Sequence, residues 1–231
     1  MDRGQLPLAL SLDTQATFDN YYVADAQRLL VAALKDAAAG TGERLIYVAG
    51  RTGRRHLLQA CCHLAERHGR YVRYIPVADL LDYPADVVLD GADQCELLCL
   101  DDLDAAAGSR DWELALFNLY NRSLACGSTL LFAAAEVPAA LPVALPDLMS
   151  RLQSFSIYRL SELSEAERIA ALQHRAAVLG LELGESLAEY IYRRCQRDLK
   201  SLFAVLTELD RHSLARQRRL TTPFVKEIMG W

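Results

Sequence analysis

The sequence predicts an α/β protein with a mostly parallel β-sheet covered by helices on both faces, followed by a small all-helical domain. Short apolar runs alternate with segments of helical spacing up to about residue 160, where strand signals stop. The strand runs are apolar throughout, which is typical of strands buried on both faces. A length of 231 residues, 52% of them hydrophobic, suits one large domain plus a small one.

The expected elements follow in order from the N-terminus. An extended arm over residues 5–12 precedes a helix over 25–39, which glycines at 40 and 42 end. Strands are then expected over 44–49, 71–76, 96–101, 128–134 and 155–160, and helices over 54–68, 84–90, 111–125 and 146–152. A Ser-x-x-Glu capping box opens a helix over 164–179, and further helices are expected over 185–194, 198–216 and 222–229. The predicted domains are therefore an arm over 1–14, a core over 15–161 and a helical domain over 162–231.

Composition and charge argue against several classes of protein. The net charge of −5 and the pI of about 5.6 give no overall attraction to nucleic acid or to an anionic membrane. The N-terminal apolar segment lacks a basic lead, and the longest later apolar stretch contains Glu136 and three prolines. We therefore expect neither a signal peptide nor a membrane span, and a cytoplasmic protein. Six cysteines without a CxxC pair indicate reduced core thiols rather than a metal site.

The stretch AGRTGRRHLLQA, directly after the apolar run LIYV, has the layout of a phosphate-binding loop. Such a loop reads G-x-x-x-x-G-K-[ST], in which backbone amides and the lysine hold phosphates and the hydroxyl holds Mg²⁺. In one register Gly53 is the last glycine, Arg54 replaces the lysine and Arg55 replaces the hydroxyl. A second register uses Gly50 and Thr52, which restores a hydroxyl but moves the helix start back. Neither register is intact, and a basic turn without a ligand is the alternative.

The segment LLCLDDLD is a second signal of a nucleotide site. Its four apolar residues place Asp101 and Asp102 at the C-terminal end of a buried strand, where open α/β sheets bind ligands. One carboxylate could hold Mg²⁺, with Asp101 as the candidate ligand, and the other could polarise water. The alternative is a strand that ends in a solvated acidic turn.

Several segments resemble the AAA+ ATPase domain of the replication initiator DnaA, and more closely the Hda family of DnaA-related regulators. They are FDNYYVADAQ, HLLQA, LCLDDLD, WELALFNLYNR, LPDLMSRL, RDLKSLF and LTTPFVKEI. The resemblance covers nearly the whole chain and implies an AAA+ core of the P-loop type followed by a helical lid. An initiator would continue into a DNA-binding domain, whereas this sequence stops at Trp231.

The segment QLPLAL near the N-terminus resembles the short peptide by which replication proteins dock on the DNA polymerase sliding clamp. Pro7 holds Leu6 in an extended conformation, and alternation places Leu8 and Leu10 on one side, where they can fill an apolar pocket. Gln5 offers an amide to the edge of such a pocket. Taken without the resemblance, the same pattern is typical of an edge strand or a frayed terminus.

The family resemblance also implies roles for two arginines. Arg151, in LPDLMSRL, takes the position of an arginine finger, which acts in trans on a γ-phosphate held by a neighbouring subunit. Taken alone, it could be a helix-end arginine paired with a carboxylate. Arg197, in RDLKSLF, takes the second sensor position, which faces a nucleotide bound in cis. The first sensor is lost, because alanines 133–135 stand where relatives have a polar residue.

The favoured hypothesis is a negative regulator of replication initiation that docks on the clamp and stimulates hydrolysis of DnaA-bound ATP. Its partners would be DnaA and the clamp, with DNA reached only indirectly and no membrane contact, and the resemblance implies a homo-oligomer. ADP is the candidate cofactor, whereas the missing hydroxyl argues against Mg²⁺. One alternative is an ATPase that uses Thr52 with Asp101 and Asp102. Another is a DNA-binding protein that uses the basic segment 211–219.

Overall fold

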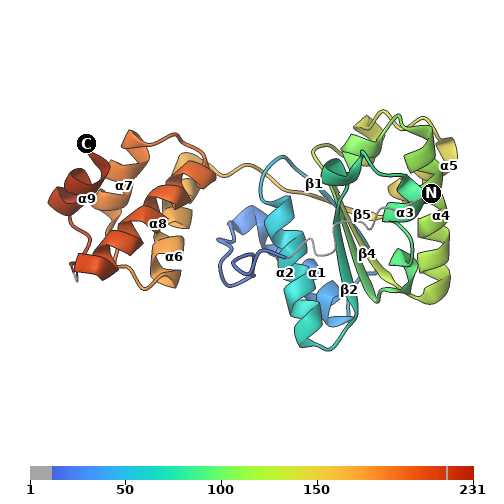
Figure 1. The fold of residues 1–231 in the computed structure, drawn as a ribbon, viewed down its shortest axis with the longest axis horizontal. Helices are drawn as coiled ribbons and strands as arrows, with labels where there is room; N and C mark the ends of the chain where they lie inside the picture. Colours follow the sequence, from blue (N-terminus) through green and yellow to red (C-terminus); the bar gives the residue numbers. More distant parts are fainter. Residues whose placement is uncertain (1–11, 217) are drawn as a thin grey trace, which may run out of the picture. The chain divides into compact units, whose positions relative to one another are not determined.

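The computed structural model describes residues 12–216 and 218–231, and it forms two compact units (Figure 1). The residues predicted to bind the clamp, Gln5, Leu6, Leu8 and Leu10, lie outside the described residues. The first unit includes Asp25–Glu162, and the second consists of Leu163–Trp231 together with Asp19–Ala24. From the sequence, residues 19–24 were predicted to belong to the core. They pack with the second unit instead, where His174 Nε2 lies 3.0 Å from the carbonyl oxygen of Asp19.

The first unit is built on a five-stranded parallel sheet of order β2-β3-β4-β1-β5. The strands are β1 (Leu45–Ala49), β2 (Val72–Pro76), β3 (Leu97–Asp101), β4 (Thr129–Ala134) and β5 (Ser156–Arg159). Because parallel neighbours need crossover connections, helices lie between them. They are α2 (Arg54–Arg67), α3 (Ala85–Val88), α4 (Arg110–Cys126) and α5 (Pro146–Gln153), whereas α1 (Arg28–Ala39) precedes β1.

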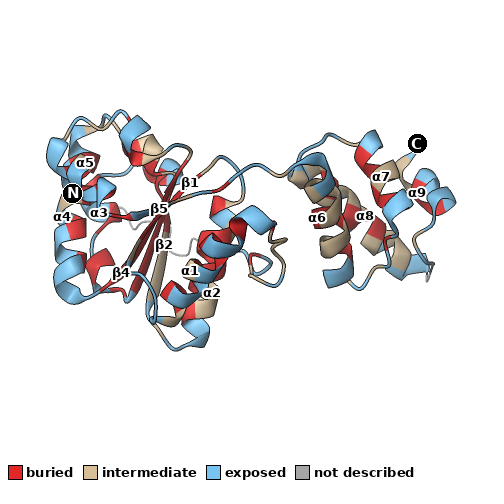
Figure 2. Cartoon of the chain, turned by 180° about the vertical axis from the view of Figure 1, so that it is seen from behind, coloured by how far each residue is buried: buried red, intermediate tan, exposed pale blue. Residues whose placement is uncertain are grey.

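Helices cover both faces of the sheet, so the central strands are buried on both sides (Figures 1 and 2). The face under α4 and α5 packs Tyr47, Leu98 and Phe132 against Trp112 and Leu148. This arrangement explains why β3 and β4 are apolar without alternation, and it confirms the predicted fold class.

Four of the six cysteines are buried free thiols as predicted; they are Cys61, Cys62, Cys95 and Cys99. The prediction of core thiols is wrong for Cys126, which is exposed at the end of α4, and Cys195 is only half-buried.

Short 3₁₀ helices, which the hydrophobic spacing did not predict, shape the loops around the sheet. They are η1 (Asp25–Gln27), η2 (Val77–Leu80), η3 (Ala92–Gln94), η4 (Leu103–Ala106) and η5 (Pro138–Ala140). Three of them, η2, η4 and η5, follow directly or closely the carboxyl ends of β2, β3 and β4. They therefore lie at the edge of the sheet where the candidate site residues are found.

The second unit consists of α6 (Glu165–Val178), α7 (Glu185–Arg194), α8 (Leu199–Arg216) and α9 (Thr222–Met229). Its core contains Leu172, Ile191, Leu206 and Val225, all fully buried. The predicted capping box opens α6, since Ser164 Oγ accepts from the Glu167 amide and Glu167 accepts from the Ser164 amide. Within the described part of the chain, no helix is long and apolar enough to cross a membrane.

Candidate functional site

The phosphate loop connects β1 to α2 at the carboxyl end of the sheet. Gly53 has a φ of 90° and immediately precedes α2, which begins at Arg54. A φ in this range favours glycine, because a side chain there would be strained. The helix start agrees with the register in which Arg54 stands at the lysine position and Arg55 at the hydroxyl position. The second register, with Thr52 at the hydroxyl position, required an earlier helix start.

Gly50 is required for a different reason, which is the close approach of the chain after β5. A Cβ atom at this position would lie 2.7 Å from both the Cβ and the carbonyl oxygen of Leu160. Leu160 cannot move freely, because its amide donates to the carbonyl of Ala49 at 2.7 Å. The glycine therefore lets the phosphate loop pack against the segment that leaves β5.

We predict that Gly50→Ala lowers the free energy of unfolding by about 1–3 kcal/mol, the usual cost of overpacking. Denaturant unfolding of the full chain measures this change. Gly184→Ala is the control, since nothing lies within 4 Å of its added Cβ and its φ of −67° suits any residue. The control should lose less than about 1 kcal/mol. Equal losses in both variants would contradict the steric argument.

Arg54 lies across the site with all three guanidinium nitrogens engaged. Its Nε donates to Asp101 Oδ1 at 3.3 Å, its Nη2 donates to Asp102 Oδ1, and its Nη1 donates to the carbonyl of Gly50. The side chain is only 10% exposed, so these are nearly buried, charge-assisted contacts. One arginine thus joins the first residue of the phosphate loop to the paired carboxylates that end β3.

Asp101 is 1% exposed, and each of its oxygens has a hydrogen-bond donor. Oδ1 accepts from Arg54 and from the Asp102 amide at 2.9 Å, and Oδ2 accepts from Tyr74 Oη at 3.0 Å. Burial raises the pKa of Asp101 above its ordinary value, and the nearby charge of Asp102 adds to this, while Arg54 and Tyr74 act in the opposite direction. The charged form of this carboxyl therefore depends on its partners.

Arg55 extends the cluster toward solvent. Its Nη2 lies 3.1 Å from Asp102 Oδ2 and 3.6 Å from Asp79 Oδ2, and its Nε lies 3.6 Å from Asp101 Oδ2. Asp102 is held in a left-handed conformation with a φ of 55°, which is strained for a residue other than glycine. Asp79 and Tyr74 were not predicted, because neither lies in a motif. The pairing of β2 with β3 brings Tyr74 to Asp101, and Asp79, on η2 after β2, lies near Arg55.

The first sensor position is apolar in the structure as well. Ala133 and Ala134 are fully buried at the end of β4. The next polar side chain, Glu136, points to Arg51 of the phosphate loop, with 3.1 Å between Oε1 and Nη2. Both partners are largely exposed, so this ion pair contributes little to stability. Within the described residues no cluster of three or more His, Cys, Asp or Glu side chains could hold a metal ion.

Arg151 lies in the last turn of α5 and is exposed. Its guanidinium carbon lies 5.6 Å from the ring centroid of Tyr120 on α4, a cation–π contact that limits its orientations. Across residues 12–216 and 218–231 no carboxylate lies within ion-pairing distance of Arg151. Within the described part of the chain, the alternative of a helix-end arginine paired with a carboxylate therefore finds no partner.

Two further contacts position the helix that carries Arg151. Buried Glu113 of α4 accepts hydrogen bonds from the amides of Ala144 and Leu145 directly before α5, at 2.9 and 2.7 Å. Tyr120 Oη lies 3.2 Å from Ser154 Oγ, just after α5. The sequence analysis did not assign Glu113 a role, because its carboxylate meets residues more than thirty positions along the chain.

Arg151 also lies at the opposite end of the sheet from the chain's own phosphate loop. It precedes β5, which begins at Ser156 and runs parallel to β1, whereas the phosphate loop follows the carboxyl end of β1. Strands of this length span about 15 Å. An arginine in this place suits a ligand bound by another chain rather than a ligand in this phosphate loop.

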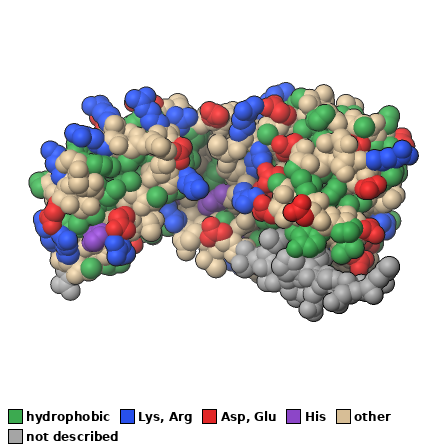
Figure 3. Space-filling view, turned by 45° about the horizontal axis from the view of Figure 1, so that its top comes forward, with side chains coloured by type: hydrophobic (Ala, Val, Ile, Leu, Met, Phe, Trp, Pro, Cys, Tyr) green, Lys and Arg blue, Asp and Glu red, His purple; other side chains and the backbone are tan. Residues whose placement is uncertain are grey.

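The second unit contains Arg197 and the basic segment of the sequence analysis. Arg197 lies between α7 and α8, exposed, with its guanidinium 5.9 Å from the Tyr192 ring. All four arginines of the basic segment have acidic partners; the pairs are Arg211–Glu208, Arg216–Glu227, Arg218–Glu227 and Arg219–Glu182. Figure 3 shows acidic side chains among the basic ones on the visible face of these helices. These pairs favour a solvated helix face over a DNA-binding surface.

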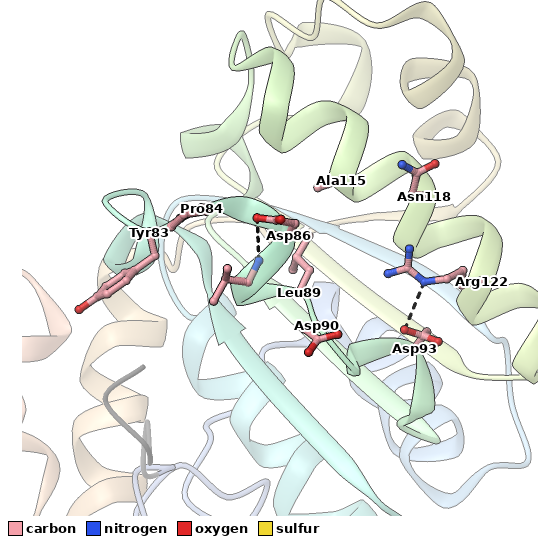
Figure 4. Close-up of a pocket in the computed structure, with 10 residues that line it drawn as sticks. Tyr83, Pro84, Asp86, Leu89, Asp90, Asp93, Ala115, Asn118 and Arg122 are labelled. Atoms are coloured by element: carbon pink, nitrogen blue, oxygen red, sulfur yellow. Dashed lines mark hydrogen bonds and ion pairs between the residues drawn. The ribbon is translucent and has the colours of Figure 1, made fainter. Parts of the chain in front are cut away.

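A groove of about 1150 Å³ lies between α3 and α4 (Figure 4). Its walls include Tyr83, Val87, Asp86, Asp90, Asn118 and Arg122. Arg122 forms an ion pair with Asp93, with 3.3 Å between Nε and Oδ1. The groove contains none of the phosphate-loop residues, so it is separate from the candidate nucleotide site.

Comparisons with known proteins agree with this geometry. Residues 165–229 match the Hda lid domain family. Domain III of the Thermotoga maritima replication initiation protein DnaA superposes with a TM-score of 0.76 at 19% identity, covering 95% of this chain and 98% of that one. AMPPCP-bound DnaA from Aquifex aeolicus gives 0.72 at 21% identity, covering 85% and 65%. The Thermotoga maritima RuvB branch migration motor gives 0.66 at 16% identity, covering 93% and 73%.

These matches confirm the resemblance that the sequence motifs indicated. The likeness to DnaA and RuvB, at these identities, establishes the AAA+ fold: a parallel sheet of order 2-3-4-1-5 followed by a helical lid. The family match then identifies the lid. The chain therefore has the AAA+ fold, with a core similar to that of DnaA, and residues 165–229 of its C-terminal helical unit match the Hda lid domain family.

Proposed function

We propose that this chain is a cytoplasmic regulator of replication initiation that acts on the initiator DnaA while docked on the sliding clamp. The observation that carries the proposal is the Hda lid domain at residues 165–229, joined to a DnaA-like AAA+ core. The chain would assemble as a homo-oligomer, would reach DNA only through the clamp and would not contact membranes. Its effect would be negative, because the initiator is left in its ADP form.

The proposed reaction takes place in the partner's nucleotide site. Water attacks the γ-phosphoryl group of ATP held by DnaA, the bond between the γ-phosphorus and the bridging oxygen breaks, inorganic phosphate is released, and ADP stays bound to DnaA. Arg151 donates to the γ-phosphoryl oxygens as negative charge shifts during transfer. Its exposure, its lack of a described carboxylate partner and its distance along the sheet from the chain's own phosphate loop support a role in trans.

Hydrolysis of ATP by the chain itself has less support. Asp101 and Asp102, which the alternative requires for metal and water, are paired with Arg54 and Arg55. Thr52 is not at the hydroxyl position that the start of α2 defines. The alanines of the first sensor position cannot orient water.

The test uses DnaA preloaded with labelled ATP, the clamp loaded on DNA, and this chain. We expect rapid conversion of bound ATP to ADP only when all three components are present. Conversion without the clamp would remove the docking step from the proposal. If no conversion occurs although the chain binds the clamp, the proposed action on DnaA is wrong.

The arm provides a second test of the proposal. Gln5→Ala combined with Leu8→Ala should weaken clamp binding at least about tenfold, because an amide contact and an apolar anchor are lost together. Surface plasmon resonance on immobilised clamp measures the affinity, and stimulation of DnaA should fall with it. Asp2→Ala, which lies outside QLPLAL, is the control and should bind as the unmodified chain does. Clamp binding that survives the double substitution would place the docking site elsewhere.

A further inference from the structure

The positive charge that balances the paired carboxylates of the core belongs to the chain itself. Asp101 Oδ1 and Asp102 Oδ1 both face the guanidinium of Arg54. Asp102 Oδ2 faces Arg55, and Asp101 Oδ2 accepts from Tyr74. Every carboxylate oxygen of the pair therefore has a donor within the chain.

We propose that Arg54 and Arg55 take the place that the magnesium nucleotide has in AAA+ ATPases. The phosphate loop is then held in its folded conformation, and the chain performs its regulatory activity, without bound ADP or ATP. The claim that the two arginines replace the magnesium nucleotide depends only on the geometry of the phosphate loop. The claim that the regulatory activity does not depend on a nucleotide bound to this chain rests on the proposed function.

The side chains around Asp101 and Asp102 do not fit a magnesium ion. A magnesium ion needs free oxygen ligands in near-octahedral geometry, and it binds carboxylates through lone pairs. Here those lone pairs accept from guanidinium groups, and Arg55 supplies no oxygen where a hydroxyl is required. A cation that entered would also be repelled by the two arginines already present.

The side chain of Arg54 also links the two ends of the phosphate loop. Arg54 Nη1 donates to the carbonyl of Gly50, so the two ends of the loop are joined through one guanidinium. With its other two nitrogens on Asp101 and Asp102, Arg54 can turn toward a phosphate only by breaking these contacts. Leaving the buried carboxyl of Asp101 without its cation is strongly unfavourable.

The remaining charges around the cluster are also accounted for. Asp79, on η2, lies 3.6 Å from Arg55, and Arg51, at the other side of the loop, pairs with Glu136. Counting Arg54 and Arg55 against Asp79, Asp101 and Asp102 leaves one net negative charge. A nucleotide with several negative charges would therefore meet a site that is already slightly negative.

The test is titration of the full chain with fluorescent mant-ADP and Mg²⁺, alongside Arg54→Lys/Arg55→Thr. We expect no saturable binding by the unmodified chain below about 1 mM nucleotide, and at least about tenfold tighter binding by the double variant. Arg51→Lys, in the same loop but paired with Glu136, is the matched control and should behave as the unmodified chain does. The thermal unfolding midpoint should rise with added nucleotide only in the double variant.

Micromolar binding of mant-ADP by the unmodified chain would overturn the proposal. So would a folded double variant, checked by circular dichroism, that binds no better. Arg55→Thr alone, which keeps the buried arginine, serves if the double variant fails to fold; it too should bind more tightly, and unchanged binding would count against the proposal. Because the titration contains no initiator, its outcome is independent of whether the chain stimulates DnaA. In the stimulation assay, removal of ADP by an enzymatic trap should leave the rate unchanged.

Discussion

Arg151→Ala should lower the stimulated rate of ATP hydrolysis on DnaA by about 10³-fold or more, the usual contribution of an arginine finger to phosphoryl transfer. The side chain is exposed and has no carboxylate partner among the described residues, so its removal should leave the fold intact. Clamp binding should not change, because the predicted docking residues lie in the N-terminal arm. Single-turnover conversion of labelled ATP to ADP, with clamp-loaded DNA, measures the rate.

Two variants make this result specific. Arg151→Lys keeps the positive charge but not the planar fork, so it should recover only part of the rate. Arg67→Ala removes an exposed arginine from the last turn of α2, on the other face of the sheet, and should have no effect. Full activity of Arg151→Ala would show that the finger lies elsewhere. Loss of both stimulation and clamp binding would indicate an unfolded core.

Arg54→Ala should lower the free energy of unfolding of the core by about 3–5 kcal/mol, the cost of removing one partner from a buried ion pair. The guanidinium is 10% exposed and has three partners, and its loss leaves the carboxylate of Asp101 buried without a cation. Arg51→Ala is the control within the same loop. Its ion pair is largely exposed, so it should cost less than about 1 kcal/mol. Guanidinium chloride unfolding distinguishes the two losses.

The cost of Arg54→Ala should also depend on pH. Burial and Asp102 raise the pKa of Asp101, whereas Arg54 lowers it, so the variant raises this pKa further. A carboxyl whose folded pKa lies above its unfolded value makes the fold less stable as pH rises between the two, and the loss is recovered as pH falls. The difference between variant and unmodified chain should therefore be larger at pH 8 than at about pH 5.

A double-mutant cycle identifies the responsible group. In the background of Asp101→Asn, Arg54→Ala should lose most of its pH dependence, because the residue at position 101 can no longer titrate. A pH dependence that persists in this background would assign it to another group of the cluster. A destabilisation no larger than that of Arg51→Ala would show that the buried contacts of Arg54 contribute little.

Much of the core could be predicted from local sequence. The alternation of unbroken apolar runs with helical segments placed all five strands within about two residues of their observed ends, and the Ser164–Glu167 box marked the start of α6. These features depend on hydrophobic period and capping, which act over a few residues. The 3₁₀ helices and the packing of Asp19–Ala24 with the second unit were not predicted, because long-range contacts decide them.

In the candidate site, too, local sequence predicted some features and not others. The sequence by itself determined which chemistry the phosphate loop lacks, since arginines stand at the lysine and hydroxyl positions and alanines at the first sensor. It also placed Asp101 and Asp102 at the end of a buried strand. It could not determine where the two arginines point, because a guanidinium reaches several angstroms and can turn toward solvent or toward a carboxylate.

Only the tertiary structure decided that Arg54 turns inward to Asp101 and Asp102, that Arg55 pairs with Asp102 from the solvent side, and that exposed Arg151 lies against Tyr120. The pairing of β2 with β3 brings Tyr74 to the carboxylate, and Glu113 ties the start of α5 to α4. For the buried charges, Arg54, Asp101 and Glu113, the physical reason is the same. A buried charge must have partners, and the fold supplies them from residues that are distant in sequence and carry no motif of their own.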